Sequence, residues 1–148
     1  MELRKVATLL MYDKEGRILL QKRKDLPKEK SLPEKFRRDY GMFGGGIEEG
    51  ETVEQALTRE MSEELELDIK QLKNLRLLRK VRFQIPELDR ERELNVFIAE
   101  MPNLKELKCH EGSMELVKIK DAIKLRISNK DRETIELLYK EIRKGVGG

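Results

Sequence analysis

The sequence predicts a mixed α/β fold with a largely antiparallel sheet, and two patterns support this prediction. Residues 3–12 and 17–23 are apolar stretches joined by a polar segment that ends in Gly16, which is typical of a β-hairpin. Residues 129–144 repeat apolar side chains every three or four positions, which predicts a helix with one buried face. Strand pairs and amphipathic helices in one chain indicate helices packed on a sheet.

The remaining elements follow along the chain. Alternating apolar residues over 75–85 and 92–101 predict a second hairpin, and residues 114–119 predict a further strand. The segment Lys22–Arg38 has eight basic and three acidic residues, which gives it a local charge of +5. It also contains two prolines, so we expect a long basic loop without regular structure there.

Length and composition limit the function classes. A chain of 148 residues fits one domain, 1–148. Its 32 Lys and Arg against 29 Asp and Glu leave a net charge of +3, which argues against a dedicated nucleic-acid surface. The longest mostly apolar run, Val6–Tyr12, is too short to span a membrane. Cys109 is the only cysteine, which excludes an internal disulfide, and His110 is the only histidine, which disfavours a zinc site. We expect a cytoplasmic protein.

A glycine-rich segment precedes the most informative helix. Five of the ten glycines fall within residues 41–50. Glycine lets the backbone approach a ligand closely, so Gly44, Gly45 and Gly46 are candidates for ligand binding. The segment Thr52–Gln55 matches a capping box, which predicts that a helix starts there.

This helix carries three acidic residues on an unexpected face. At about 100° per residue, Glu60, Glu63 and Glu64 fall on the same side as Leu57 and Met61. A solvated acidic face, which is the alternative, would place the glutamates opposite the apolar side chains. Crowded carboxylates repel one another and are costly to bury unless a cation neutralises them. Because Mg²⁺ prefers oxygen ligands and joins carboxylates to phosphates, we predict a magnesium site.

The segment Gly45–Leu67, GGIEEGETVEQALTREMSEELEL, resembles the Nudix box. That pattern is Gly, five residues, Glu, seven residues, Arg-Glu, an aliphatic, any residue, Glu-Glu, any residue, Gly and an aliphatic. Eight of its nine positions are matched in register, by Gly45, Glu51, Arg59, Glu60, Met61, Glu63, Glu64 and Leu67. Glu66 stands where the family has its second glycine, so the helix either ends there in a left-handed conformation or continues. The resemblance implies a Nudix-type α/β/α sandwich.

The resemblance also implies an activity. It implies a Mg²⁺-dependent pyrophosphohydrolase, with Mn²⁺ as a substitute metal, that cleaves a nucleoside diphosphate linked to another moiety. The metal would polarise the diphosphate and lower the pKa of a water that attacks phosphorus in line. Arg59 would pair with Glu51 and orient the helix against the preceding loop. The metal ligands that the resemblance implies are Glu60, Glu63, Glu64 and a backbone carbonyl near Gly44.

Four residues are candidates for further roles in this activity. Glu60 is the first candidate for deprotonating the water. Glu111 precedes the last predicted strand, where family members often carry a glutamate that binds metal or acts as the general base, and an exposed loop acid is the alternative. Arg23 resembles a family position that touches the substrate, with a solvated arginine as the alternative. Asn129 resembles an asparagine that reads the base, with an ordinary helix N-cap as the alternative.

The box leaves the substrate open. ADP-ribose hydrolases of the family tend to carry a proline where Arg82 stands, and dinucleoside-polyphosphate hydrolases carry a tyrosine near Phe83 and Gln84. The absence of both favours a nucleoside triphosphate or its oxidised purine form, which would give a nucleoside monophosphate and pyrophosphate. ADP-ribose, an NDP-sugar and a dinucleoside polyphosphate are the alternatives. As partners we expect a nucleotide, no membrane and a second copy in a homodimer.

Two other classes of protein compete with an enzyme. Nudix domains that sense nucleotides without cleaving them usually lose a box glutamate, whereas Glu60, Glu63 and Glu64 are all present. An RNA-binding domain would depend on Lys22–Arg38, in which Phe36 is the single aromatic residue available for stacking on bases. We therefore predict an enzyme and consider nucleic-acid binding the weaker hypothesis.

Overall fold

The computed structural model describes residues 1–147 and forms one sheet covered by helices. The strands are β1 (Glu2–Tyr12), β2 (Arg17–Lys22), β3 (Tyr40–Gly41), β4 (Phe43–Gly46), β5 (Arg76–Ile85), β6 (Arg90–Glu100) and β7 (Ser113–Lys118). The α-helices are α1 (Pro27–Lys30), α2 (Val53–Leu65), α3 (Ile119–Ala122) and α4 (Asn129–Gly147). Short 3₁₀ turns cover Glu34–Phe36, Ile69–Gln71, Pro86–Leu88 and Leu104–Glu106.

The sheet has seven strands and is mixed, with one parallel pair. Its main path runs β3-β2-β1-β6-β5, while β4 pairs with β1 and β7 pairs with β2. Strands β1 and β6 are parallel along their whole length, from Glu2 opposite Arg90 to Tyr12 opposite Glu100. All the other pairs are antiparallel. The predicted mixed, largely antiparallel sheet is therefore confirmed.

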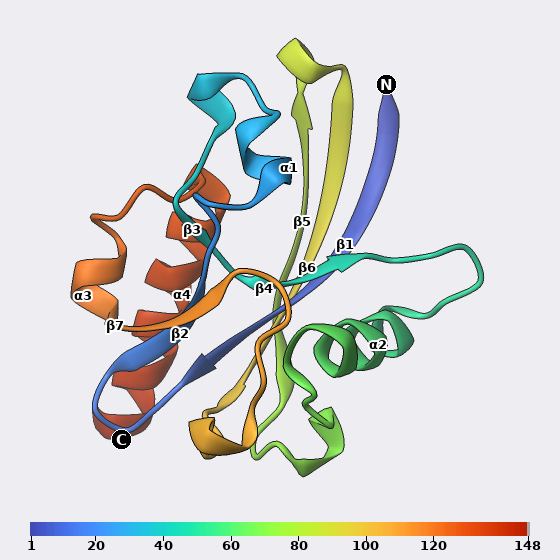
Figure 1. The fold of residues 1–148 in the computed structure, drawn as a ribbon. Coiled ribbons are helices and arrows are strands. Elements are labelled where there is room, and N and C mark those ends of the chain that lie inside the picture. The colour runs from blue at the N-terminus through green and yellow to red at the C-terminus, as the bar shows by residue number, and fades with distance from the viewer. Residues whose placement is uncertain (148) are drawn as a thin grey trace.

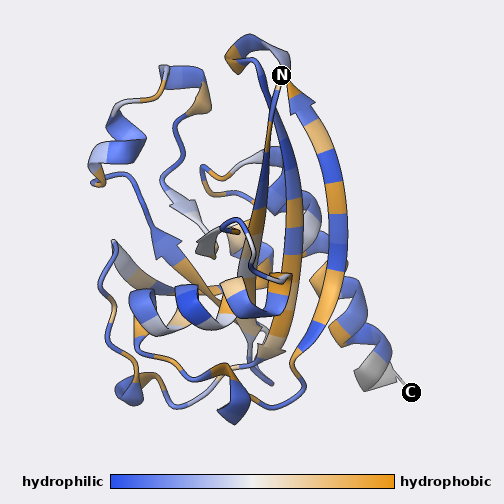
Figure 2. Ribbon diagram, turned by 90° about the vertical axis from the view of Figure 1, so that its right-hand side faces the viewer, coloured by the Kyte–Doolittle hydropathy of each residue, from blue (hydrophilic) through white to orange (hydrophobic). Residues whose placement is uncertain are grey.

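Helices cover both faces of the sheet, as Figure 1 shows for α2 on one side and α4 on the other. The alternation of side chains along β1 divides its apolar residues between two cores. Leu9 packs in a cluster with Leu57 of α2, and Leu10 packs in a second cluster with Ile135 of α4. Strand β5 alternates between polar and apolar residues from Lys80 to Ile85, and this alternation is visible in Figure 2. The α/β/α arrangement is confirmed.

The basic segment after β2 differs from its prediction. Instead of a loop without regular structure, it contains α1 and the 3₁₀ turn Glu34–Phe36. Pro27 is the first residue of α1, where its missing N–H costs no intrahelical hydrogen bond. Pro33 likewise precedes the 3₁₀ turn, so both prolines begin helical turns. Over residues 1–147, no helix is both long and apolar enough to cross a membrane.

Helix α2 begins and ends as its sequence indicates. The Thr52 hydroxyl accepts a hydrogen bond from the Gln55 N–H at 3.1 Å, and the Gln55 side chain accepts one from the Thr52 N–H at 2.9 Å. This reciprocal pair is the predicted capping box. At the other end, Glu66 adopts a left-handed conformation with φ of 51°, so the helix stops after Leu65. Of the two outcomes expected for Glu66, the helix end is the one observed.

Candidate active site

The glycine strand β4 lies directly against α2, and two of its glycines account for the close approach. The Gly44 N–H donates a hydrogen bond to Oε2 of Glu64 at 2.7 Å. Gly44 has a φ of +139°, and a Cβ built on it would lie 2.2 Å from the carbonyl oxygen of Ala7. A Cβ at Gly45 would lie 2.6 Å from Oε1 of Glu60. A side chain at Gly44 would therefore clash with the backbone of β1, and one at Gly45 would meet the Glu60 carboxylate of α2.

Three carboxylates gather beside these glycines. Glu64 is almost fully buried, at 4% exposure, and Glu60 lies one helical turn before it. Burial raises the pKa of Glu64 well above its usual range, and its hydrogen bond with Glu111 and the charge of Glu60 act in the same direction. The Gly44 N–H opposes this shift. Carboxylates held this close, with one of them buried, favour a bound cation that would compensate their charge.

Glu111 reaches this group from the loop before β7. The Gln21 side-chain amide donates a hydrogen bond to the Glu111 backbone carbonyl at 2.8 Å, and Nζ of Lys28 lies 3.5 Å from Oε1 of Glu111. Burial opposes ionisation of Glu111, but its bond with Glu64 and the nearby Lys28 and Arg23 charges lower its pKa overall. The structure thus places Glu111 next to Glu64, which favours a site residue over an exposed loop acid.

Arg59 ties the helix to the preceding loop. Its Nε donates to Oε2 of Glu51 at 2.8 Å, and its Nη2 donates to the Gly46 carbonyl at 3.0 Å. Its Nη1 donates to Oε1 of Glu60 at 2.9 Å. The hydrogen bond from Arg59 lowers the pKa of Glu51 to about 2 and raises the pKa of Arg59. The geometry agrees with an orienting role for this pair and also shows that Arg59 holds the Glu60 carboxylate.

Glu63 does not lie with the other carboxylates. Its side chain is 61% exposed and points to Arg59, whose Nη1 lies 3.4 Å from it. The expectation that all three box glutamates lie at the buried margin is wrong for Glu63, because it sits at the edge of the apolar arc where its long side chain reaches solvent. Correspondingly, the described part of the chain contains no closed set of three or more metal-binding side chains.

Of the two residues expected to touch the substrate, Arg23 lies near the carboxylates and Asn129 does not. Arg23 is mostly buried, donates to the Gln21 side chain, and pairs with Glu29 at 3.3 Å, so it is not a solvated strand-end arginine. Asn129 is the first residue of α4, and its side chain accepts a hydrogen bond from Arg132. The capping oxygen at this helix belongs to Ser128, which accepts from the Asp131 N–H at 3.1 Å. The structure does not bring Asn129 into contact with the carboxylates.

Sequence reasoning missed Gln21. This side chain is fully buried and links Arg23 to the Glu111 loop. A signal was present, since Gln21 follows three consecutive apolar residues in β2, and a polar residue in a buried strand needs a partner.

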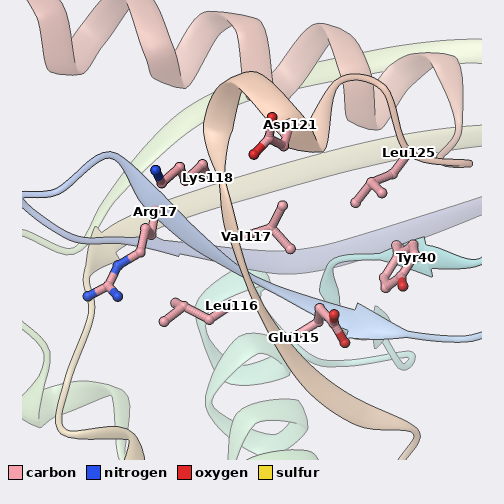
Figure 3. A pocket seen from close by; sticks show the side chains of 8 residues that line it. All are labelled: Arg17, Tyr40, Glu115, Leu116, Val117, Lys118, Asp121 and Leu125. Carbon is pink, nitrogen blue, oxygen red and sulfur yellow. The ribbon is translucent and has the colours of Figure 1, made fainter.

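A divalent cation fits this donor set. Glu64 lies near both Glu60 and Glu111, and although the described residues form no group of three that converges on one point, Mg²⁺ needs few protein ligands because it keeps several waters. A separate cavity of about 420 Å³ lies between β7 and α3, away from the carboxylates (Figure 3). Its eight lining residues include Tyr40 and Asp121 but none of these glutamates, so it is not the acidic site.

The fold and this site define a class of α/β/α proteins in which one helix presents carboxylates beside a glycine strand. The NUDIX domain profile matches residues 2–138, so the chain belongs to the Nudix family and is a hydrolase. Nudix hydrolases generally use divalent metal ions.

Solved structures show the same fold. The chain is 23% identical to the E. coli dihydroneopterin triphosphate pyrophosphohydrolase, with a TM-score of 0.68 over 92% of this chain and 96% of that one. It is 22% identical to the MutT Nudix hydrolase of Burkholderia pseudomallei, with a TM-score of 0.68 over 93% and 98%. It is 18% identical to a C. elegans Ap4A hydrolase, with a TM-score of 0.66 over 95% and 98%. The sequence matches no curated protein.

Proposed function

We propose that this Nudix hydrolase cleaves the diphosphate bond of a nucleoside diphosphate derivative with the help of Mg²⁺. The observation that carries this proposal is the meeting of Glu60, Glu64 and Glu111 beside Gly44 and Gly45. A dense group of carboxylates repels a polyanionic substrate unless a cation lies between them, and Mg²⁺ joins carboxylates to phosphates in this way.

Residues of the acidic site and the neighbouring Arg23 would have separate roles in metal and substrate binding. Glu60 and Glu64 would hold the cation from α2, and Glu63 would join them through a rotation of its exposed side chain. The Gly44 backbone carbonyl would complete the protein ligands. When bound, the cation would neutralise the diphosphate oxygens and lower the pKa of the attacking water. Arg23, beside Glu111, would add positive charge for the substrate phosphates.

Glu60 and Glu111 are both candidates for accepting the proton of the water. Arg59 donates a hydrogen bond to Oε1 of Glu60 at 2.9 Å and holds this carboxylate in place. The charges of Lys28 and Arg23 favour the ionised form of Glu111. A comparison of the Glu60→Gln and Glu111→Gln variants distinguishes the two. The proton acceptor is the residue whose loss removes the acidic limb of the pH–rate profile.

For the substrate we propose a nucleoside triphosphate, including an oxidised purine form, cleaved to a nucleoside monophosphate and pyrophosphate. One solved structure with this fold is a dihydroneopterin triphosphate pyrophosphohydrolase, which supports this preference. Another is an Ap4A hydrolase, which keeps a dinucleoside polyphosphate as the alternative. The second candidate is a domain that binds nucleotides without cleaving them. The retained carboxylates favour the enzyme. The cytoplasmic location and the homodimer remain predictions from the sequence.

The test is product formation from ATP, dGTP, 8-oxo-dGTP, ADP-ribose, diadenosine tetraphosphate and an NDP-sugar, each with Mg²⁺ or with EDTA. Chromatography identifies the products. We expect cleavage of a triphosphate that requires Mg²⁺ and releases pyrophosphate. Nucleotide binding without cleavage of any compound would instead favour the sensing domain.

A further inference from the structure

Two arginines lie side by side on the sheet face that α4 covers. Arg4 of β1 and Arg92 of β6 are register partners in the parallel pair. Further along the same strands, Leu10 and Ile98 are also register partners, and both pack in the core on the α4 side. Because side chains alternate along a strand, Arg4 and Arg92 project from that same face. They therefore lie on the opposite face from α2.

Two further arginines, from the basic segment, lie over Gly41 of β3. Tyr40 and Met42, on either side of Gly41, pack in the core on the α4 side, so Gly41 faces the α2 side. A Cβ built at Gly41 would lie 2.9 Å from Cδ of Arg23 and 3.5 Å from Nη1 of Arg38, so both side chains cross Gly41. The ion pair of Lys35 with Glu87, at 3.2 Å, joins the basic segment to the turn between β5 and β6. The segment and this turn lie at the same end of the molecule as the start of β1 (Figure 1).

The four guanidinium groups share one region. Burial lowers the pKa of Arg92, and the charges of Arg4, Arg38 and Arg23 lower it further, together with that of Arg90. A half-buried cation whose strongest charged neighbours are cations is electrostatically unfavourable unless an anion joins it. A solvated arginine surface, the plain alternative, would not place Arg92 under this burial.

The carboxylates near this region are already engaged. Buried Glu29 pairs with Arg23 at 3.3 Å and accepts a hydrogen bond from the Arg38 backbone N–H. Buried Asp131 pairs with Arg38 at 3.4 Å. Within residues 1–147, Arg4 and Arg92 are not in an ion pair with any carboxylate. Glu29 and Asp131 therefore position Arg38, while Arg4 and Arg92 keep their charge for a ligand.

The glycine strand connects this region to the acidic site. The Glu60 carboxylate lies against Gly45 on the α2 side, and the Arg4 side chain lies against Gly46, with its Nε 3.3 Å from a Cβ built there. Strand β4 pairs only with β1, so its other edge is not covered by a strand of the described chain. Gly45 and Gly46 are consecutive residues of this strand, so the carboxylate side and the arginine side meet at neighbouring positions along it.

We propose that Arg4 and Arg92, with Arg38 beside them, bind a phosphate group of the substrate that lies outside the diphosphate being cleaved. This inference rests on the proposed function and narrows it. A substrate that reaches both sites carries three or more phosphates in a chain. Compounds with two phosphates, such as ADP-ribose, would occupy the acidic site alone. Paired guanidinium groups suit a phosphate because each offers two parallel N–H donors.

The first test measures anion binding without catalysis. Calorimetry in EDTA compares tripolyphosphate with pyrophosphate for the wild type and for the Arg4→Gln and Arg92→Gln variants. Arg76→Gln is the control, because Arg76 lies opposite Ile98, roughly 20 Å along the sheet from Arg92. We expect each variant in the cluster to weaken tripolyphosphate binding about tenfold or more, and the control to leave it within about twofold. Equal binding by all four proteins, or no binding by the wild type, would overturn the proposal.

The second test separates substrate classes. The Arg92→Gln variant should raise the KM for ATP about tenfold and leave kcat/KM for ADP-ribose within about twofold. Equal losses on both substrates would contradict the proposal. If tripolyphosphate binding depends on Arg4 and Arg92 but the protein cleaves no nucleotide, the anion site is supported and the proposed function is refuted.

A stability measurement separates a binding role from a structural one. Because Arg92 has no ion pair to lose, its replacement should keep or raise Tm, whereas replacement of a merely structural arginine would lower it.

Discussion

The Glu64 carboxylate accepts a hydrogen bond from the Gly44 backbone N–H at 2.7 Å. This contact joins α2 to the glycine strand and fixes the carboxylate at the centre of the acidic site. It also positions the Gly44 peptide, whose carbonyl would face the same cation. One bond therefore aligns two of the proposed metal ligands, which come from opposite sides of the loop that carries Glu51.

Replacement of Glu64 by Gln should remove activity and preserve the fold. Gln keeps the shape of the side chain and an oxygen that can accept from Gly44, but it loses the negative charge that a cation needs. We expect turnover to fall to less than about a tenth of the wild type, with a Tm close to it. Glu54→Gln, on the exposed side of the same helix, is the control and should change neither value. If the Glu64→Gln enzyme keeps more than about a tenth of the wild-type turnover, Glu64 is not a metal ligand.

Gly45→Ala should displace Glu60 without unfolding the protein. The added Cβ would meet the end of the flexible Glu60 side chain, 2.6 Å away, and that side chain can move aside. A displacement of about 1 Å at a reacting group can cost about a hundredfold in rate, so we expect kcat to fall by up to that factor. Steady-state kinetics in the Glu60→Gln background gives the control. There the Gly45→Ala change should have little further effect, and additive losses would show that it acts elsewhere.

The pairing of Glu51 with Arg59 should make stability depend on acidic pH. Arg59 lowers the pKa of Glu51 from 4.5 to about 2. A carboxylate with a lowered pKa stabilises the folded state above its unfolded pKa, and this contribution is lost as the pH falls through the folded value. The Tm of the wild type should therefore exceed that of Glu51→Gln above about pH 5, and the gap should close between about pH 4.5 and 2. A gap that stays constant across this range would contradict the ion pair.

Glu66→Gly should stabilise the protein. The left-handed conformation of Glu66 costs about 1–2 kcal/mol for a residue with a Cβ, and glycine removes that cost. The change also removes the exposed pair of Glu66 with His110, which contributes about 0–1 kcal/mol. Denaturant unfolding should show a net gain of about 1 kcal/mol, with turnover within a few-fold of the wild type. A hundredfold change in rate would show that Glu66 affects the chemistry.

Much of this molecule could be predicted from the sequence where the signal is local. The capping box at Thr52 and the first hairpin depend on neighbouring residues, and both are confirmed. The parallel pairing of β1 with β6 could not be predicted, because periodicity identifies a strand but not its partner. The helical turn at Pro27 was missed because proline stops a helix interior but suits its first position.

In the site, too, local features could be predicted from the sequence and contacts between distant segments could not. The register of Glu60 and Glu64 follows from helical geometry alone. The approach of Glu111 to Glu64 joins residues that are far apart in the sequence, and only tertiary structure brings them together. The arginine pair of Arg4 and Arg92 depends on strand register between distant segments, so no local pattern reveals it.

The central claim is that Glu64 and its neighbouring carboxylates hold a divalent cation, and the binding of Mn²⁺ tests it most directly. Electron paramagnetic resonance would count bound Mn²⁺ in the wild type, in Glu64→Gln and in the exposed control Glu54→Gln. The account predicts a site that the wild type and the control share and that Glu64→Gln loses. Equal Mn²⁺ binding by all three proteins, or none by the wild type, would contradict it.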